Sequence, residues 1–165
     1  MNSRRITAVA LVAVLAPLAG SSWRSSAASS GSESHAAVAA PVVELLSRGT
    51  VAEPFEAKAH GIELEAERPI DVAVAHLTFA PGASTGWHKH PGPTVVTVTV
   101  GELTVTSRRC ERRTYEAGET FVEKGPRRHR AVNTGTGTTE SIVTFFVPAG
   151  AEALTMPTPA PPCAR

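Results

Sequence analysis

The chain lacks a strong net charge and an apolar run long enough to cross a bilayer comfortably. Its 165 residues carry 16 lysines and arginines against 15 aspartates and glutamates, a formal charge of +1. This balance gives no reason to expect nucleic acid or an anionic membrane as a partner, because both attract strongly basic proteins. The sequence also contains no solenoid-type repeat and no long amphipathic helix. Its length is sufficient for one domain with a real core.

Aromatic residues are scarce, with one tyrosine, two tryptophans and five phenylalanines. Valine and threonine are abundant instead, and β-branched residues favour strands over helices. From residue 42 onward, short alternating segments are separated by glycine and proline about every ten residues, which is typical of an all-β barrel or sandwich. The predicted strands are Val43–Val51, His60–Ala66, Ile70–Ala80, Thr85–His90, Thr94–Val100, Leu103–Arg108, Thr114–Tyr115, Glu119–Glu123, His129–Asn133 and Thr139–Val147.

The first residues have the pattern of an export signal. Arg4 and Arg5 precede the apolar run Ile6–Ala19, and small residues follow it. We expect a signal peptide over residues 1–28, with an uncleaved membrane anchor as the alternative. No cysteine lies near the candidate cleavage positions, which argues against a lipoprotein anchor. These positions are Ser21, Ala27 and Ala28.

The N-terminal arginines also resemble the core of a twin-arginine signal. We therefore expect export to the periplasm or the cell exterior by the Sec or the twin-arginine route, with no stable membrane anchor after cleavage. Residues 29–41 are rich in serine, alanine and glycine and are expected to form a flexible leader. The strand-rich domain is predicted over residues 42–149, and a proline-rich, extended tail over residues 150–165.

The chain has two cysteines, Cys110 and Cys163. One disulfide between them fits an exported protein and would tie the tail to the loop after the Leu103–Arg108 strand. The alternative is a pair of free thiols, one of which caps a metal.

Two histidines, His88 and His90, lie two residues apart, and on a strand such residues point to the same face. Imidazole is a good ligand for zinc, iron, nickel and copper, so this spacing indicates a metal site. A third histidine, His129, lies downstream and is followed by Asn133. His60 and His76 do not share this spacing, and His76 alternates with Val72 and Val74, as a packed or edge histidine would.

These histidines lie in two segments that resemble the two motifs of the cupin superfamily. Residues 82–101 (GASTGWHKHPGPTVVTVTVG) resemble the first motif, G-x5-H-x-H-x3-E-x6-G, and residues 118–133 (GETFVEKGPRRHRAVN) resemble the second, G-x5-P-x-G-x2-H-x3-N. The surrounding sequence resembles small exported bacterial single-domain cupins. The resemblance implies a cupin-type barrel, that is, a double-stranded β-helix or jelly roll, and a metal ion held by His88, His90 and His129. It also implies that the ion is divalent iron, manganese, nickel or zinc, and that the protein forms a homodimer.

The chain departs from the motifs at three positions. Thr94 occupies the glutamate position of the first motif, and Lys124 and Pro126 replace the proline and glycine of the second. A hydroxyl is a weak ligand, so Thr94 cannot donate the negative charge that the cupin glutamate supplies. Glu123 is the nearest carboxylate within the motifs, and Glu111 and Glu116 are alternatives on loops.

The remaining motif residues have structural interpretations. Asn133 is expected to hold a turn, and Trp87 alternates away from the histidines toward the other side of the sheet. Three arginines surround His129 and form either an attractive site for an anionic substrate or a solvated basic loop. They are Arg127, Arg128 and Arg130.

Two classes of function follow from these features. One is a metal-dependent enzyme acting on a small molecule by oxygen activation, isomerisation or metal-bound water. The other is a non-catalytic cupin that binds a metal or small ligand or serves as a structural module. The three histidines favour the first, and the missing glutamate favours the second.

Overall fold

The computed structural model of the chain describes residues 38–164. The signal peptide predicted over residues 1–28 and most of the leader predicted over residues 29–41 lie outside the described residues. Within the described range the secondary structure consists of strands and one 3-10 turn, η1 (Pro162–Ala164). This part of the chain contains no helix with the length and apolar character needed to cross a membrane.

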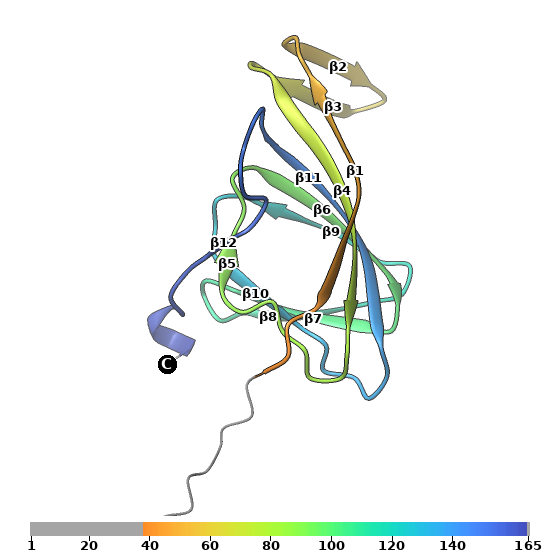
Figure 1. Cartoon of the computed structure of the whole chain (residues 1–165), viewed down its shortest axis with the longest axis vertical. Coiled ribbons are helices and arrows are strands. Elements are labelled where there is room, and N and C mark those ends of the chain that lie inside the picture. The colour runs from red at the N-terminus through yellow and green to blue at the C-terminus, as the bar shows by residue number, and fades with distance from the viewer. Residues whose placement is uncertain (1–37, 165) are drawn as a thin grey trace, which may run out of the picture. The chain divides into compact units, whose positions relative to one another are not determined.

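Twelve strands follow one another along residues 38–164 (Figure 1). They are β1 (Val42–Val51), β2 (Phe55–Ala59), β3 (Ile62–Ala66), β4 (Ile70–Phe79), β5 (His88–Lys89), β6 (Pro93–Val100), β7 (Glu102–Ser107), β8 (Arg112–Glu116), β9 (Thr120–Lys124), β10 (His129–Val132), β11 (Thr139–Pro148) and β12 (Met156–Pro157).

Ten of these strands form two five-stranded antiparallel sheets that enclose a barrel (Figure 1). The first sheet has the order β1-β4-β11-β6-β9, and the second has the order β12-β5-β10-β7-β8. Both sheets contribute to one buried apolar core, with Val98 and Val143 from the first and Leu103 and Ala131 from the second. The arrangement confirms the predicted all-β double-stranded β-helix, or jelly-roll, barrel.

Burial alternates along β4 and β11, which are neighbours within the first sheet. Every second residue of β11 is buried, from Thr139 through Val147, and Ala73, Ala75 and Phe79 of β4 are buried in the same way. A strand with period-2 burial presents one face to the core and the other away from it. Ala73, Ala75 and Phe79 therefore lie on the face of β4 that packs in the core.

The hairpin of β2 and β3 corrects one strand prediction. His60 was expected to begin a strand, but it lies with Gly61 in the turn between the two strands, and both residues have positive φ values of 52° and 80°. Positive φ is typical of a two-residue hairpin turn. The preceding strand, β2, was missed because Phe55–Ala59 contains two charged residues and lacks β-branched side chains.

The C-terminal segment returns to the barrel. Met156 and Pro157 pair with Lys89 and His88 of β5, so the tail forms the edge of the second sheet. The tail was predicted to be extended, but its pairing with the strand that carries His88 was not foreseen.

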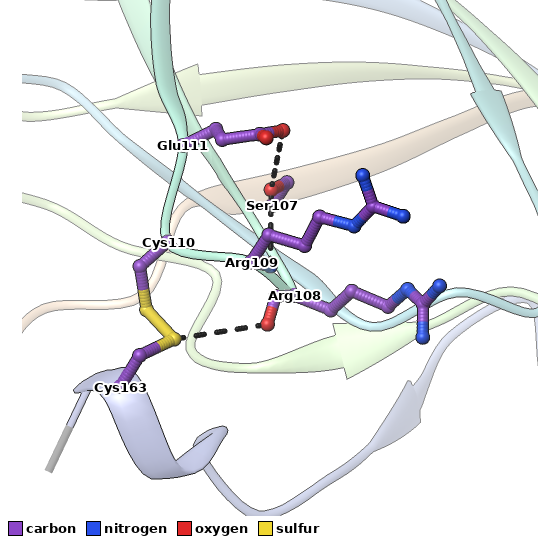
Figure 2. The surroundings of a disulfide bond; sticks show 6 residues. All are labelled: Ser107, Arg108, Arg109, Cys110, Glu111 and Cys163. Carbon is purple, nitrogen blue, oxygen red and sulfur yellow. Dashed lines mark hydrogen bonds between the residues drawn. A yellow bond between two sulfur atoms is a disulfide. The ribbon is translucent and has the colours of Figure 1, made fainter.

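A disulfide joins Cys110 to Cys163, with the two Cα atoms 6.2 Å apart (Figure 2). It attaches η1 at the end of the tail to the loop between β7 and β8. The alternative of two free thiols, one of them a metal ligand, is therefore wrong. A disulfide between cysteines 53 positions apart closes a loop in the unfolded chain and so lowers its entropy. In the chain-entropy model this raises the free energy of unfolding by about 4 kcal/mol.

Candidate metal centre

Strand register brings the three motif histidines together. His88 and His129 are directly opposite each other on β5 and β10, and His90 lies two residues beyond His88 on the same face. The ring centroids are 4.2 Å apart for His88 and His129, 4.8 Å for His88 and His90, and 5.1 Å for His90 and His129. We refer to these three residues as the histidine cluster. Its side chains are buried, with 4 to 7% of each residue exposed.

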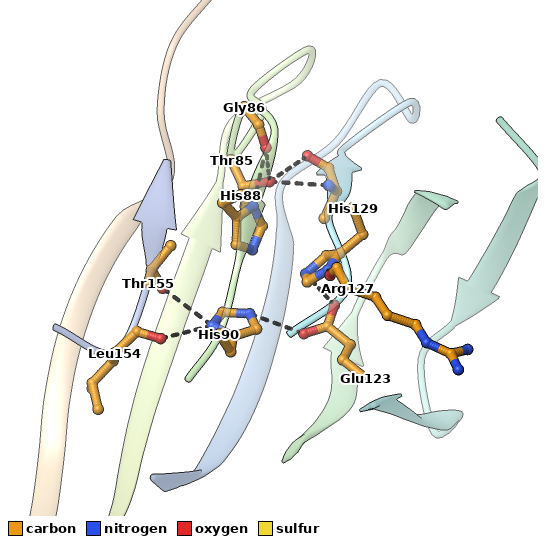
Figure 3. A network of polar contacts seen from close by, with 10 residues as sticks. Thr85, Gly86, His88, His90, Glu123, Arg127, His129, Leu154 and Thr155 are labelled. Carbon is orange, nitrogen blue, oxygen red and sulfur yellow. Dashed lines mark hydrogen bonds and ion pairs between the residues drawn. The ribbon is translucent and has the colours of Figure 1, made fainter. Parts of the chain in front are cut away.

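Backbone carbonyl groups orient each ring of the cluster (Figure 3). The Nδ1 atoms of His88 and His129 are each 3.0 Å from a carbonyl oxygen two residues earlier, those of Gly86 and Arg127. The Nδ1 atom of His90 is 2.7 Å from the carbonyl oxygen of Leu154 in the C-terminal tail. Because a carbonyl only accepts hydrogen bonds, each Nδ1 carries the proton, and each Nε2 is directed away from the backbone.

Glu123 on β9 contacts two members of the cluster. Its Oε2 atom is 3.1 Å from Nε2 of His90, and its Oε1 atom is 2.9 Å from Nε2 of His129. Burial opposes ionisation of this carboxyl group, but the hydrogen bonds with His129 and His90 outweigh burial and lower the pKa of Glu123 to about 2. The carboxylate is therefore ionised within an otherwise enclosed site.

The two facing histidines respond to this environment in opposite directions. Burial, followed by the nearby charge of His129, lowers the pKa of His88 to about 4. Burial also acts to lower the pKa of His129, but its hydrogen bond to Glu123 and the carboxylate charge raise the pKa overall. Neutral imidazole is the form that binds metals, and His88 is held in that form at ordinary pH.

The donor set of the cluster fits a divalent transition metal ion. One ligand atom from each of the three histidines lies within 4.8 Å of the others. Imidazole nitrogens suit zinc, iron and nickel, and ligating histidines usually donate the remaining ring N–H to a carbonyl or carboxylate, as all three do here. The described residues thus contain a buried three-histidine site that could hold a metal, with a carboxylate against it.

The fold shows which of the candidate ligands Thr94, Glu111, Glu116 and Glu123 lies against the histidine cluster. Thr94 is fully buried on β6 directly opposite Glu123 on β9, but its hydroxyl has no hydrogen-bond partner and does not belong to the cluster. Glu111 instead accepts a hydrogen bond from Ser107, and Glu116 is exposed on β8. Of the three carboxylates considered from the sequence, Glu123 is the one that contacts the histidines.

A cavity of about 250 Å³ lies beside the histidine cluster. His88, His90 and Glu123 line it together with apolar side chains from both sheets. Val43 on the edge strand β1 also lines the cavity and is 61% exposed, so the cavity reaches solvent beside this strand. The site is therefore accessible to a small molecule while its polar groups remain mostly enclosed.

The other histidine and asparagine of interest have structural contacts. His76 Nε2 is 3.2 Å from Glu140 Oε2, away from the cluster. Asn133 is fully buried, and its side chain donates to the carbonyl oxygens of Phe79 and Gly137 and accepts from the Gly135 N–H. Its predicted role in holding a turn is confirmed.

The basic residues around His129 have separate contacts. The Arg130 guanidinium lies 5.6 Å from the centroid of the Trp87 ring, and neither residue lines the histidine cavity. Arg128 donates to the Pro159 carbonyl in the tail, and the Arg127 carbonyl accepts from His129. These contacts give Arg128 and Arg130 roles in packing.

Sequence reasoning missed Leu154, Thr155 and Ser141. Leu154 acts through its backbone carbonyl, and Thr155 Oγ1 lies 3.5 Å from the same His90 nitrogen. A backbone contact leaves no signal in residue type, and both residues lie outside the motifs. Ser141 lines the cavity, and its place on the inward face of the β11 pattern was the available signal.

Comparison with known proteins finds a family model that matches part of the chain. Residues 75–145 match the family model described as the cupin domain. The structure is similar to a double-stranded β-helix domain protein from Klebsiella pneumoniae at 18% identity, with 71% of this chain and 85% of that chain covered and a TM-score of 0.51. No curated protein matches the chain.

Two further solved structures are similar at lower TM-scores. One is a cupin domain from Bordetella pertussis, with 15% identity, 66% of this chain and 95% of that chain covered, and a TM-score of 0.47. The other is an oxalate oxidase in complex with glycolate, with 30% identity, 46% of this chain and 41% of that chain covered, and a TM-score of 0.42.

Proposed function

We propose that this chain is a member of the cupin superfamily, whose domain model matches residues 75–145, and that it binds one divalent transition metal ion through His88, His90 and His129 and acts on a small molecule with it. The ion is iron, manganese, nickel or zinc, and the reaction is of the dioxygenase or isomerase type. The observation that carries the proposal is the orientation of the three rings. Each Nδ1 is paired with a backbone carbonyl, so the three Nε2 atoms are the ones left to bind an ion, once His90 and His129 give up the Nε2 protons that they donate to Glu123.

Glu123 would complete the ligand set with the negative charge that Thr94 lacks. Its carboxylate is already within 3.1 Å of two of the three Nε2 atoms, so little rearrangement is needed for it to share their ligand. A pKa of about 2 makes this group suited to balance positive charge rather than to take up a proton, because a general base works best with a pKa near the working pH.

A divalent ion held there would supply Lewis acidity to a bound oxygen or carbonyl group. The chain itself would orient the molecule and exclude water, through the apolar walls of the cavity and the buried histidines. The Leu154 carbonyl would keep the His90 ring in one tautomer by accepting a hydrogen bond from its Nδ1–H group.

Metal analysis tests this function. The mature protein, exported by a bacterial host and purified without chelators or a histidine tag, is expected to contain about one equivalent of a transition metal. His88→Ala and His129→Ala should lose the metal while retaining the circular dichroism of a folded β barrel. His76→Ala is the matched control, because this histidine contacts Glu140 outside the site, and it should retain the metal. Absence of metal from the wild-type protein, with none taken up on titration, would contradict the proposal.

A second candidate function is supported by the composition of the cavity. Apart from the histidines and Glu123, the described residues that line it are apolar or carry a hydroxyl, and they include no lysine, arginine, tyrosine or cysteine. This composition favours a non-catalytic cupin that binds a metal and a small ligand. A turnover screen with each of the four ions, with oxygen uptake as one readout, separates the two. Turnover that His88→Ala abolishes and His76→Ala preserves would assign an enzyme.

We also propose that the protein functions after export. The Cys110–Cys163 disulfide supports an oxidising compartment, where such bonds persist. Fractionation of cells that express the full chain, followed by intact mass analysis of the mature protein, tests both the location and the processing predicted near residue 28.

A further inference from the structure

We propose that the cavity beside the histidine cluster binds a small, uncharged and largely apolar molecule, and that Ser141 hydrogen-bonds a polar group at the end of that molecule farthest from the histidines. The inference rests on the proposed function, since it names the substrate class of the same site. Three observations carry it: the lining of the cavity, its size and the unpartnered hydroxyl of Ser141.

The lining selects against a charged molecule. Between the histidine cluster and Ser141 the walls are mostly apolar side chains from both sheets. They include Leu77, Phe79, Val96, Leu103, Val143 and Phe145. A charge placed among such groups loses its hydration without gaining a partner, which is costly.

The size of the cavity limits the molecule. An apolar cavity of about 150 Å³ holds benzene, so one of about 250 Å³ has room for on the order of ten non-hydrogen atoms. Phe145 packs edge-on against His90, with ring centroids 5.3 Å apart, and Ser141 lies four residues earlier on the same face of β11. At ~3.3 Å per residue, the two backbone positions are about 13 Å apart. An elongated molecule of this size can reach from the cluster to Ser141.

Ser141 presents the polar group that such a molecule would meet. The residue is 1% exposed and lines the cavity, and its Oγ atom has no hydrogen-bond partner. Its cross-strand neighbours are Leu77 and Val98, which offer no side-chain partner. A buried hydroxyl without a partner destabilises a fold, so a ligand that supplies the missing hydrogen bond gains affinity at this position.

Four hydroxamic acids, which bind metals through the hydroxamate group, test the inference on zinc-loaded protein by isothermal titration calorimetry. Acetohydroxamate has the metal-binding group alone, and hexanohydroxamate adds an apolar body. The third, 6-hydroxyhexanohydroxamate, adds a terminal hydroxyl, and adipic monohydroxamate ends in a carboxylate instead. We expect the six-carbon neutral probes to bind at least ~10-fold tighter than acetohydroxamate, because their methylene groups are buried. The carboxylate-ended probe should bind at least ~10-fold more weakly than the hydroxyl-ended one.

The Ser141→Ala variant isolates the hydroxyl. It should weaken 6-hydroxyhexanohydroxamate by about 5-fold and leave hexanohydroxamate within ~2-fold, since only the first probe has a group to pair with Ser141. Without ligand, the variant should melt at the same or a higher temperature than the wild type, because it removes an unpartnered hydroxyl. Thr144→Ala on the opposite face of β11 is the matched control and should leave all four affinities unchanged.

Three results would overturn the inference. They are tight binding of the carboxylate-ended probe, equal weakening of both neutral probes by Ser141→Ala, and a lower melting temperature of that variant without ligand. The metal content of the same samples shows whether the inference about the cavity has failed alone or whether the proposed metal binding has failed as well. If the protein binds no zinc, 1-hexanol followed by NMR of the protein amides reports on the cavity alone. Binding of 1-hexanol that Ser141→Ala weakens supports the cavity site without the metal, and no binding rejects it.

Discussion

Thr94 and Glu123 face each other on the neighbouring strands β6 and β9, in direct register. Thr94 occupies the glutamate position of the motif that the sequence resembles, and the carboxylate at the site comes from the adjacent strand instead. Opposite residues of an antiparallel pair lie on the same face of the sheet, so a carboxylate at either position can reach the same site. The chain thereby keeps an ionised carboxylate against the histidine cluster although the motif residue is missing.

We predict that Glu123→Gln weakens metal binding by about 10- to 100-fold, because it removes a negative charge that contacts the cluster. The measurement is competition against a chromogenic chelator at constant pH. Glu111→Gln is the control, since Glu111 is exposed and contacts Ser107. Equal affinity of Glu123→Gln and the wild type would show that the carboxylate has no part in metal binding.

The exchange of the two residues tests the cross-strand relationship itself. We predict that the double variant Thr94→Glu with Glu123→Thr recovers most of the affinity that Glu123→Gln loses, because the carboxylate returns from the facing position. Thr94→Glu alone should lower thermal stability, since a second carboxylate would be buried beside the first. A double variant no better than Glu123→Gln would mean that the position of the carboxylate, and not only its charge, is essential.

The C-terminal tail should support the metal site through one backbone carbonyl. We predict that truncation before Leu154 weakens metal binding by about 10-fold, because His90 Nδ1 loses the carbonyl that orients it. Leu154→Ala is the informative control, since it keeps the carbonyl and should leave the affinity within about 2-fold. The metal affinities of the truncated protein and of Leu154→Ala are measured by competition with a chelator. An equal loss of affinity in the two would mean that the Leu154 side chain acts through packing and not through its carbonyl.

The disulfide is expected to stabilise the fold by holding the tail. We predict that the Cys110→Ser, Cys163→Ser double variant loses up to about 4 kcal/mol of unfolding free energy in urea, because the unfolded chain is no longer closed into a loop. Reduction of the wild-type protein should produce the same decrease, and reduction should have no effect on the double variant. An unchanged unfolding midpoint after reduction would contradict a stabilising role.

Asp71 should make the free energy of unfolding depend on pH in the acid range. It is buried, and its hydrogen bonds with Thr50, Arg48 and the Gly150 N–H lower its pKa. A lowered pKa in the folded state gives stability that is fully present above the unfolded value of about 3.9 and is lost as pH falls through the folded value. We predict that Asp71→Asn is less stable than the wild type at neutral pH, and that the difference shrinks below about pH 4.

Thermal melting across this pH range provides the measurement for Asp71. Glu53→Gln is the control, because Glu53 is exposed between β1 and β2 and should leave the pH dependence as it is in the wild type. A constant difference between Asp71→Asn and the wild type at all pH values would mean that the carboxylate is not ionised in the folded protein.

Much of the barrel was predictable because strand patterns are local. The strands predicted at Ile70–Ala80 and Thr139–Val147 are observed as Ile70–Phe79 and Thr139–Pro148, since alternation of side chains along a strand follows from sequence position alone. The hairpin before Ile70 was the exception. Its strand Phe55–Ala59 is exposed except for a partly buried Phe55, so no buried face left a pattern in the sequence.

The sequence by itself determined the shared face of His88 and His90, the candidate third ligand His129 through its motif, and the absence of the motif glutamate. Residue types and short spacings can be read directly from the sequence, and on a strand the spacing of two residues decides whether their side chains share a face. Only the tertiary structure decided which carboxylate serves the site, that the Leu154 carbonyl orients His90, and that Ser141 is left without a partner in an apolar cavity. Each of these depends on contacts between segments far apart in the chain, such as the 64 positions between His90 and Leu154. Such contacts are set by sheet register and the return of the tail, for which no local pattern carries the information.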